Sequence, residues 1–356
     1  MANPSHQYIE RTTGQVRTER FIGDRSVRCL YSAAREHAPV IFKALTSRFA
    51  NDLVATLQFD LPLLTRWGKL RSALERAGLR TDEMVNPPSP VTSLRNLFER
   101  QIRFWECRPM PNDPNCVVAP SDSRMLCGGQ AGNTNLAIKQ KLFGLSELLG
   151  AKSRWGPHFA FGDWAAFRLT PEKYHYNHFP VAGEIVDFYE IKGAFHSCNP
   201  IAVIKNPAAS AQNGRSITVI DTGVPGGTGI GLVAMIEVVA LMIGEVHQCY
   251  SAQYYLDPCP MKPGMQVQRG AVKSLFRPGS STVILLFEPS RVQFDLDLLA
   301  NLRRRDASSR FSAGFCEPLV ETEVNVRSSI ASPLAPTSAQ RLTSLFLEKS
   351  VHEYFR

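Results

Sequence analysis

The fold is decided by one stretch, Phe276-Arg277-Pro278-Gly279-Ser280-Ser281-Thr282-Val283-Ile284-Leu285-Leu286-Phe287. Its Arg-Pro-Gly approach favours a turn, and the apolar, β-branched run that follows predicts a buried strand. Two adjacent hydroxyl residues, Ser280 and Ser281, therefore stand where a loop enters a sheet.

The serine pair has two interpretations. Hydroxyl groups at such a position commonly cap a strand or bond a nearby carbonyl. Alternatively, Ser281 Oγ attacks the carbonyl carbon of Ser280. That reaction needs a strained turn and a nearby base, because a serine hydroxyl is a poor nucleophile until its proton is removed. The resulting N-to-O acyl shift and β-elimination would cut the chain and leave a pyruvoyl group. A cut between Gly279 and Ser280 is the alternative register.

Composition describes a folded, basic protein. The chain has 356 residues, of which 44% are hydrophobic and 20% charged, so it can fill a core and is not a disordered chain. The length allows one large domain, or a main domain with an N-terminal helical extension. The net charge of +8 favours an acidic partner, either anionic lipid or nucleic acid. No helix-turn-helix, zinc-finger or aromatic RNA-binding signature occurs, so lipid is favoured and no nucleic-acid partner is expected.

The cysteines and the apolar runs restrict the compartment. The 8 cysteines include no CxxC pair, which argues against a zinc ribbon or a secreted disulfide scaffold and fits a reducing compartment. The polar N-terminus shows no secretory signal. The apolar run over residues 232–243 is interrupted by Glu237 and is too short to span a membrane. Membrane contact is therefore expected to be peripheral.

The N-terminal part predicts helices. After a polar preface at residues 8–23, apolar residues recur at helical intervals over residues 25–78, with basic residues between them. Such a region either packs its apolar stripe on the core or lies partly in a bilayer interface over residues 40–67. A proline-rich linker follows at residues 80–90, and residues 93–102 predict an amphipathic helix.

The remainder of the chain is β-rich, which predicts an α+β fold: an N-terminal helical, membrane-associating region on a mostly antiparallel β core. A helix is expected at 294–305 and an edge strand at 319–326. The expected domains are residues 1–80 (preface and amphipathic helices), 81–115 (linker and helix), 116–330 (catalytic β-rich domain) and 331–356 (tail). The strand candidates are 117–118, 159–161, 165–169, 185–189, 217–220, 230–243 and 283–287.

Three further residues could carry chemistry. Asp122 follows a strand and a proline, where an aspartate is most often a turn former. His175 and His178 form an HxxH pair bracketed by Pro171 and Pro180. A third ligand with sensible local spacing is missing from this stretch, so a metal site is not expected, and two ordinary core or surface histidines are the simpler interpretation.

These motifs, in their order along residues 8–330, resemble the phosphatidylserine decarboxylase family. The most specific runs from Leu169 to Gly183 and is similar to the family's L-[ST]-P-x-[DK]-Y-H-x-x-H-x-P-x-x-G. The C-terminal signature, F-x-x-G-[GS]-S-T-[VI], usually has glycine where this chain has Ser280, and the V-[SA]-P-x-D-[GS] motif usually has glycine at Ser123. Other matching segments are 8–16, 93–109, 139–150, 195–199, 213–215 and 262–272.

The resemblance implies roles for these residues. Ser281 would be the processed serine, giving a β chain that ends at Ser280 and an α chain that starts at Ser281. His178 would be the base paired with Asp122, and His175 would face the substrate. The pyruvoyl group derived from Ser281 would be the cofactor: it would form a Schiff base with the substrate amine and act as the electron sink for loss of CO₂, with no metal.

The implied function is conversion of phosphatidylserine to phosphatidylethanolamine by a peripheral protein on the cytoplasmic face of a membrane. Expected partners are phosphatidylserine in an anionic membrane surface and the protein's own α and β chains, and a homodimer would be ordinary for such a fold. Two alternatives stay open: a pyruvoyl decarboxylase of a free aromatic amino acid, and an unprocessed, non-catalytic binding or scaffold homologue.

The sequence also leaves Asn199, Asn213 and Arg215 open. In one interpretation the two asparagines form turns and Arg215 pairs with a core carboxylate. In the other, Arg215 forms part of the floor of the site or of a headgroup pocket.

Overall fold

The computed structural model describes residues 5–21, 72, 75–76, 78–86, 94–129, 144–151, 153–240, 245–278 and 281–334. Most of the predicted helical region at 25–78, part of the linker and nearly all of the predicted tail lie outside the described residues. Gly279 and Ser280 also lie outside them, so the proposed cleavage bond is described only on its Ser281 side.

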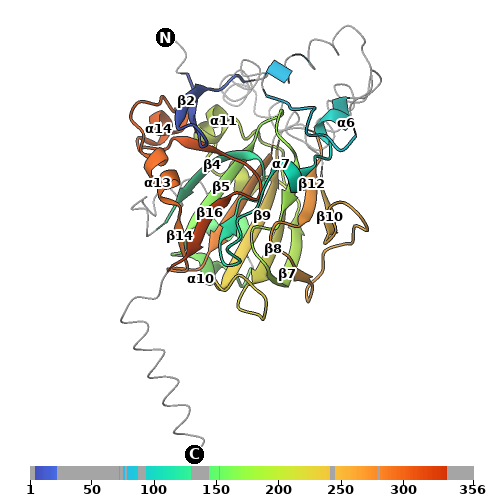
Figure 1. Cartoon of the computed structure of the whole chain (residues 1–356). Helices are drawn as coiled ribbons and strands as arrows, with labels where there is room; N and C mark the ends of the chain where they lie inside the picture. The colour runs from blue at the N-terminus through green and yellow to red at the C-terminus, as the bar shows by residue number, and fades with distance from the viewer. Residues whose placement is uncertain are drawn as a thin grey trace, which may run out of the picture.

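A ten-stranded sheet organises the described part of the chain (Figure 1). Its strands pair antiparallel except β1 with β15, which are parallel. The fold is therefore α+β with a mostly antiparallel core, as predicted. In sheet order the strands are β11 (Gln266–Val267), β7 (Gly183–Ile191), β8 (Arg215–Asp221), β9 (Leu232–Val239), β13 (Ser281–Phe287), β5 (Trp164–Leu169), β4 (Ser123–Gly128), β15 (Glu321–Val324), β1 (Gln7–Glu10) and β2 (Gln15–Thr18).

Strand β13 lies inside this sheet, between β9 and β5. Val283, Leu285 and Phe287 enter one apolar core, while Ile284 and Leu286 enter the core on the opposite face. A strand with both faces buried has no polar side to alternate with, which explains its continuous apolar run. The buried strand predicted from this stretch is confirmed.

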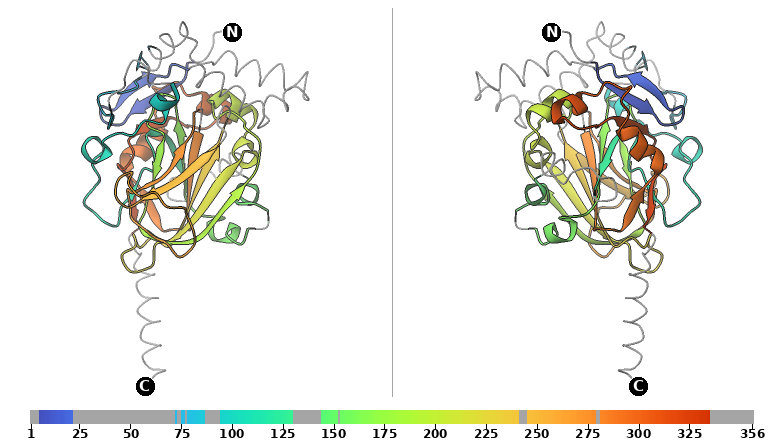
Figure 2. Two further views of the ribbon diagram at one scale, coloured as in Figure 1. Left: turned by 90° about the vertical axis from the view of Figure 1, so that its right-hand side faces the viewer. Right: turned by 90° about the vertical axis from the view of Figure 1, so that its left-hand side faces the viewer.

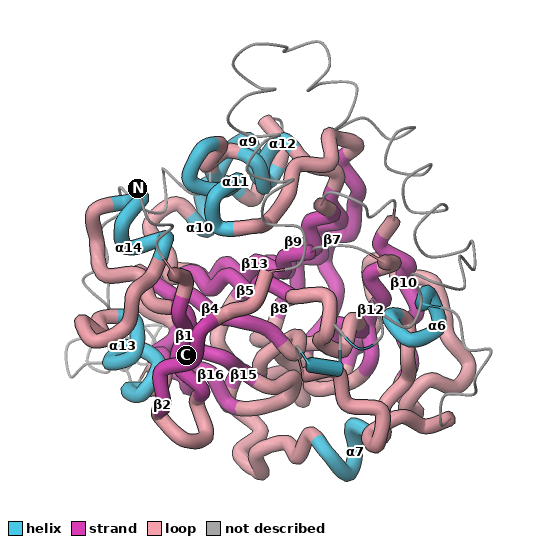
Figure 3. Tube along the Cα trace, turned by 90° about the horizontal axis from the view of Figure 1, so that it is seen from above, coloured by secondary structure: helices cyan, strands magenta, loops and turns pink. Residues whose placement is uncertain are grey.

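Two smaller sheets and a group of short helices cover the two faces. Helices α9 to α12 gather on one face, and the small sheets contribute to the core on the other (Figure 3). The small sheets are β10 (Val246–Ser251), β12 (Val272–Phe276) and β6 (Tyr176–His178), and β14 (Val292–Phe294), β16 (Ser329–Pro333) and β3 (Val117–Val118). The helices are α6 (Leu94–Phe98), α7 (Phe104–Cys107), α9 (Leu145–Leu149), α10 (Gly156–Phe159), α11 (Pro200–Lys205), α12 (Ala209–Gln212), α13 (Leu296–Leu302) and α14 (Arg310–Phe315).

Three expectations about the elements need correction. The polar preface contains the hairpin β1–β2, which forms one edge of the main sheet and lies at the upper end of the molecule in both views of Figure 2. The predicted edge strand at 319–326 is β15, an interior strand between β4 and β1. The predicted strand at 159–161 is wrong. Phe159 is the buried last residue of helix α10, and Phe161 beyond the helix is 58% exposed.

Within the described residues, no helix is both long enough and apolar enough to cross a membrane.

Candidate active site

Ser281 opens β13 and is fully buried. It is aligned with Leu169 of β5 on one side and with Val239 of β9 on the other. Its Oγ has no hydrogen-bond partner among the described residues. A buried hydroxyl without a partner is costly, and such groups are often functional. The serine is therefore held in the sheet while its hydroxyl remains available for chemistry.

His178 ends β6 and is also fully buried. Its Nδ1 lies 2.9 Å from the carbonyl oxygen of Gly270. A carbonyl can only accept, so Nδ1 carries the proton and Nε2 keeps a lone pair in the neutral ring. Burial, with Phe104 packed edge-on against the ring at 4.6 Å, lowers the pKa of His178 to about 4. The imidazole is therefore neutral at pH 7 and carries its free lone pair on Nε2.

A tyrosine pair continues from that lone pair. The Tyr174 hydroxyl lies 3.0 Å from Nε2 of His178 and donates to it. The Tyr255 hydroxyl lies 2.7 Å from that of Tyr174 and accepts from the backbone N–H of Ile102 at 3.1 Å. Burial raises the pKa of both tyrosines, so both stay protonated. The four groups form a buried chain of hydrogen bonds that ends on the imidazole.

His175 presents the other buried imidazole. Its Nδ1 donates to the carbonyl of Lys173 at 2.8 Å, and Phe98 packs on the ring with centroids 3.6 Å apart. Its Nε2 is buried without a hydrogen-bond partner in the described part of the chain. Burial, helped by the charge of Arg100, lowers the pKa of His175 to about 3. Like Ser281 Oγ, this nitrogen is a buried polar atom with unused bonding capacity.

Asp122 lies between β3 and β4, buried against Arg108. Nε and Nη2 of Arg108 donate to its carboxylate at 2.9 and 2.7 Å, and the backbone N–H of Val326 donates at 2.8 Å. The same guanidinium also binds Glu83 at 2.9 and 3.1 Å. Burial alone would raise the pKa of Asp122, but Arg108 outweighs it and holds that pKa below its usual value. The aspartate is therefore a carboxylate at neutral pH.

Backbone hydrogen bonds join the segments that carry Asp122, His175 and His178 to each other and to β12. The N–H of His178 donates to the carbonyl of Pro120, two residues before Asp122, at 2.8 Å. The carbonyl of His175 accepts from Phe276, the last residue of β12 before the turn to Ser281, at 3.0 Å. The expected hydrogen bond between Asp122 and His178 is not formed, since each has other partners. The carbonyl of Gly270 holds the proton of His178 on Nδ1.

A buried charge network anchors the strand between the histidines. Glu237 and Lys273 are both fully buried, with Nζ 2.6 Å from the carboxylate. The same carboxylate accepts from Asn177 at 3.1 Å and from Gln248 at 3.0 Å, and Ser274 also donates to it. Asn177 lies between the two histidines in sequence. The network therefore fixes β6, which ends at His178 and directly follows His175.

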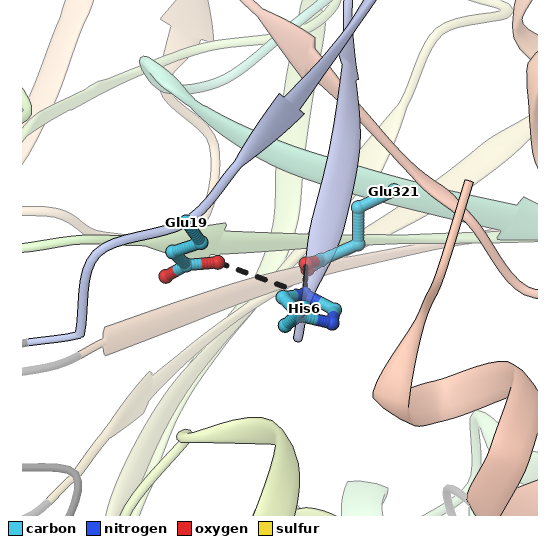
Figure 4. Close-up of side chains that lie close together, drawn as sticks. All are labelled: His6, Glu19 and Glu321. Atoms are coloured by element: carbon cyan, nitrogen blue, oxygen red, sulfur yellow. Dashed lines mark hydrogen bonds and ion pairs between the residues drawn. The ribbon is translucent and has the colours of Figure 1, made fainter. Parts of the chain in front are cut away.

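A second buried cluster contains His6, Glu19 and Glu321 (Figure 4). Nε2 of His6 lies 2.7 Å from Glu321 and 3.6 Å from Glu19, which is close enough to suggest a metal. However, Arg168 binds both carboxylates, with Nη2 2.7 Å from Glu19 and 2.6 Å from Glu321. Burial would raise the pKa of Glu321, but Arg168 and His6 lower it to about 2. We interpret the cluster as an ion-pair network that fastens the N-terminal hairpin to the sheet.

The three residues left open have structural contacts. Asn199 caps α11 by accepting from the N–H of Ile201 at 3.0 Å. Asn213 donates to the carbonyls of His196 and Val239 at 2.9 and 2.8 Å. Within the described part of the chain Arg215 pairs with no carboxylate; it donates to backbone carbonyls, including Leu148 in α9 at 2.7 Å.

Sequence reasoning missed several of these residues. Tyr174 stands inside the histidine motif and Arg108 inside another matched segment, yet neither received a role. Glu237 gave a usable signal, a single carboxylate within an apolar run, which in a soluble core requires a buried partner. Tyr255 gave none, because a tyrosine pair in a loop, Tyr254-Tyr255, carries no spacing that points to a histidine 77 residues earlier.

Comparison with known proteins agrees with the motifs. A family model described as phosphatidylserine decarboxylase matches residues 94–308. The phosphatidylserine decarboxylase proenzyme of Chlamydia trachomatis serovar L2 is 31% identical over 309 residues, which is 84% of this chain and 92% of that protein. The phosphatidylserine decarboxylase proenzyme of Fusobacterium nucleatum is 27% identical over 304 residues, covering 84% of this chain and 93% of its own length.

Proposed function

Because this chain belongs to the phosphatidylserine decarboxylase family, we propose that it cuts its own backbone between Ser280 and Ser281 and then converts phosphatidylserine to phosphatidylethanolamine and CO₂. The observation that carries the proposal is the buried Oγ of Ser281, at the first residue of an interior strand, which makes no hydrogen bond with any described residue. The neutral imidazoles of His175 and His178 lie on the segment that pairs with β12, the strand that precedes Ser281 in the chain.

Self-cleavage starts at the serine. Once the Tyr174 hydroxyl has released Nε2 of His178, Oγ of Ser281 attacks the carbonyl carbon of Ser280 and its proton passes to that nitrogen. The proton then moves to the leaving nitrogen of residue 281 as the C–N bond breaks, which gives an ester and a free amine. Loss of the α-proton of residue 281 then expels the carboxylate of Ser280. The remaining enamine takes up water and releases ammonia, which leaves a ketone on residue 281. Asp122 contributes negative charge that favours the imidazolium during the first step.

Because Ser281 itself becomes the pyruvoyl group, the cofactor needs no separate binding site, and the unpartnered Oγ fits this origin. When formed, the group supplies an electrophilic carbonyl for the substrate amine and an electron sink for decarboxylation. His175 is the candidate to return a proton to the substrate carbon that loses CO₂, after its Nε2 has taken that proton from the substrate ammonium group as the amine condenses with the ketone. Its Nε2 is buried and makes no hydrogen bond with any described residue, so it can accept and release that proton.

The proposal also covers where the protein works and which partners it has. The net charge of +8 supports an anionic membrane surface on the cytoplasmic side as the place of work. The α and β chains would remain partners after cleavage. A homodimer and the membrane-associating role of residues 25–78 stay predictions.

The first test is a denaturing gel of the purified protein. We expect two pieces instead of one band near 39.6 kDa, and a ketone that reacts with hydrazine on the smaller piece. Ser281→Ala should stay full length, whereas Ser280→Gly, which restores the family's usual residue, should still be cut. A Ser281→Ala chain that is cut at this bond would show that the nucleophile is wrongly assigned.

The second test separates the alternatives. CO₂ release is measured from phosphatidylserine vesicles and from free aromatic amino acids. Release from the vesicles supports the proposal, and release from the amino acids alone replaces it with the second enzyme. An uncut chain without a reactive ketone supports the scaffold alternative.

A further inference from the structure

A cavity of about 380 Å³ adjoins the strand next to Ser281. Its wall includes Arg17 of β2, Arg20 just after it, and Leu169 at the end of β5. Leu169 is the residue aligned with Ser281 across the β5–β13 pair. Neighbouring strands are roughly 4.8 Å apart, so the cavity begins about one strand spacing from the serine backbone.

The wall of this cavity is rich in arginine. Among the described residues, its lining includes five arginines and two glutamates: Arg17, Arg20, Arg76, Arg124, Arg168, Glu19 and Glu172.

The two deepest arginines are already engaged. Arg124 lies 2.6 Å from Glu19, and Arg168 bonds both Glu19 and Glu321. These ion pairs hold the cavity wall together, and the carboxylates largely offset the positive charge of the two arginines. They therefore shape the cavity more than they attract a ligand.

The three exposed arginines of the cavity wall are less engaged than the two buried ones. Arg20 is exposed and has no hydrogen bond or ion pair with any described residue. Arg76 is exposed, and its Nε donates to the carbonyl of Ser72 at 3.0 Å; its other guanidinium nitrogens bind no described residue. Arg17 pairs with Glu10 at 2.9 Å on the surface, where such pairs are weak and readily exchanged. The cavity mouth thus carries guanidinium groups that can still bind an anion.

The substrate of the proposed reaction supplies that anion at a matching position. The amine that meets residue 281 is joined to phosphorus through two carbons and an oxygen, a separation of about 5 Å by ordinary bond lengths. That is close to the spacing between Ser281 and the wall of the cavity. Guanidinium groups match phosphate geometry and remain charged at any physiological pH.

We propose that this arginine-lined cavity binds the phosphodiester of the substrate headgroup, with Arg20 and Arg76 as the groups that select a phospholipid over a free amino acid. The inference rests on the proposed decarboxylation of phosphatidylserine and adds the site that recognises it. A free amino acid has no phosphate, so it would leave these two arginines unused.

The binding test does not depend on activity. Full-length Ser281→Ala protein, which should stay uncut, is titrated calorimetrically with glycerophosphoserine, L-serine and inorganic phosphate. We expect glycerophosphoserine to bind, and L-serine to bind at least about tenfold more weakly. Adding Arg20→Gln and Arg76→Gln together should weaken glycerophosphoserine binding by about tenfold. The control Arg291→Gln removes an exposed arginine that pairs with Glu288 at 3.5 Å and lies outside the cavity wall; it should leave binding unchanged.

Three results would overturn the proposal. The double variant could bind glycerophosphoserine as well as the parent does. L-serine could bind as tightly as glycerophosphoserine. Inorganic phosphate could bind while glycerophosphoserine fails to displace it, which would make the cavity a site for the free ion.

The activity arm separates this inference from the proposed function. In the self-processed enzyme, the double variant should raise KM for phosphatidylserine in mixed micelles by about tenfold, with kcat and the extent of self-cleavage little changed. An equal loss with Arg291→Gln would mean a general surface-charge effect and would count against the cavity. If the parent enzyme releases no CO₂ from phosphatidylserine, the proposed function fails, and the binding arm still reports on the cavity.

Discussion

The hydroxyl of Tyr174 lies 3.0 Å from Nε2 of His178, and Nδ1 of the same imidazole lies 2.9 Å from the carbonyl oxygen of Gly270. The imidazole is therefore held at both nitrogens by neutral groups. The oxygens of Asp122 bind Arg108 and the N–H of Val326 instead, so in the proposed reaction Asp122 would act on His178 through its charge alone.

Removing the Tyr174 hydroxyl should loosen that arrangement. Tyr174→Phe leaves Nε2 of His178 buried without its donor, and we expect the free energy of unfolding to fall by about 1–3 kcal/mol. Self-cleavage, followed on a gel after synthesis, should slow because the base loses one of its two anchors. Tyr176→Phe is the matched control, since Tyr176 stacks on Tyr174 with centroids 5.5 Å apart and does not touch the base. Equal effects in both variants would assign the result to ring packing.

Arg108 should be among the most sensitive residues of the site. Arg108→Leu leaves Asp122 and Glu83 as buried carboxylates without their cation, and breaking such a pair costs about 3–5 kcal/mol. Urea unfolding of the Ser281→Ala background would measure the loss without interference from cleavage. Arg304→Leu removes an arginine from an exposed pair with Asp306 and should change the urea midpoint far less. Similar midpoints for the two variants would contradict the role given to Arg108.

The buried histidines predict a pH dependence of stability. Their pKa values are about 3 and about 4 in the folded chain, against 6.5 for a free histidine. Between these values the unfolded chain binds more protons, so stability falls as pH falls below about 6.5. At pH 5 each histidine should lower the free energy of unfolding by about 2 kcal/mol relative to neutral pH. His175→Gln in the Ser281→Ala background should flatten part of this slope; an unchanged slope would mean that His175 is not buried in its neutral form.

The Glu237–Lys273 pair can be tested by a double-mutant cycle. Lys273→Met alone leaves Glu237 buried beside polar groups only, with an expected loss of about 3–5 kcal/mol. Adding Glu237→Leu should recover part of that loss, because an apolar pair of similar volume no longer needs a counter-charge. Denaturant midpoints of the four proteins give the coupling. A double variant with the full sum of both single losses would show that the pair is not coupled.

The sequence predicted the elements that carry a strong local pattern. Val283 to Phe287 is apolar throughout because the strand is buried on both faces, and the prediction of a buried strand needed nothing else. The run at 159–161 failed because three residues cannot distinguish a short strand from the end of a helix. The N-terminal hairpin escaped notice because β2 is mostly exposed and its sequence is polar. Its parallel pairing with β15 joins residues more than 300 positions apart, which local pattern does not encode.

The site residues themselves stay predictions, because motif order pointed to Asp122, His175, His178 and Ser281 without their surroundings. The partners that set each group's chemistry come from elsewhere in the chain: Arg108 for Asp122, and Gly270 with Tyr174 for His178. Hydrogen-bond partners of this kind depend on the packing of whole elements, so they became visible only in three dimensions.

The position of Ser281 at the first residue of β13 has a consequence for the product of the proposed cleavage. The segment that begins at Ser281 supplies β13, between β9 and β5, and β15, between β4 and β1. Strands from the two fragments are thus interleaved in a single sheet. Separating the two fragments would break the strand pairing at both places. The cleaved protein should therefore stay together as one folded unit, although no peptide bond joins the two fragments.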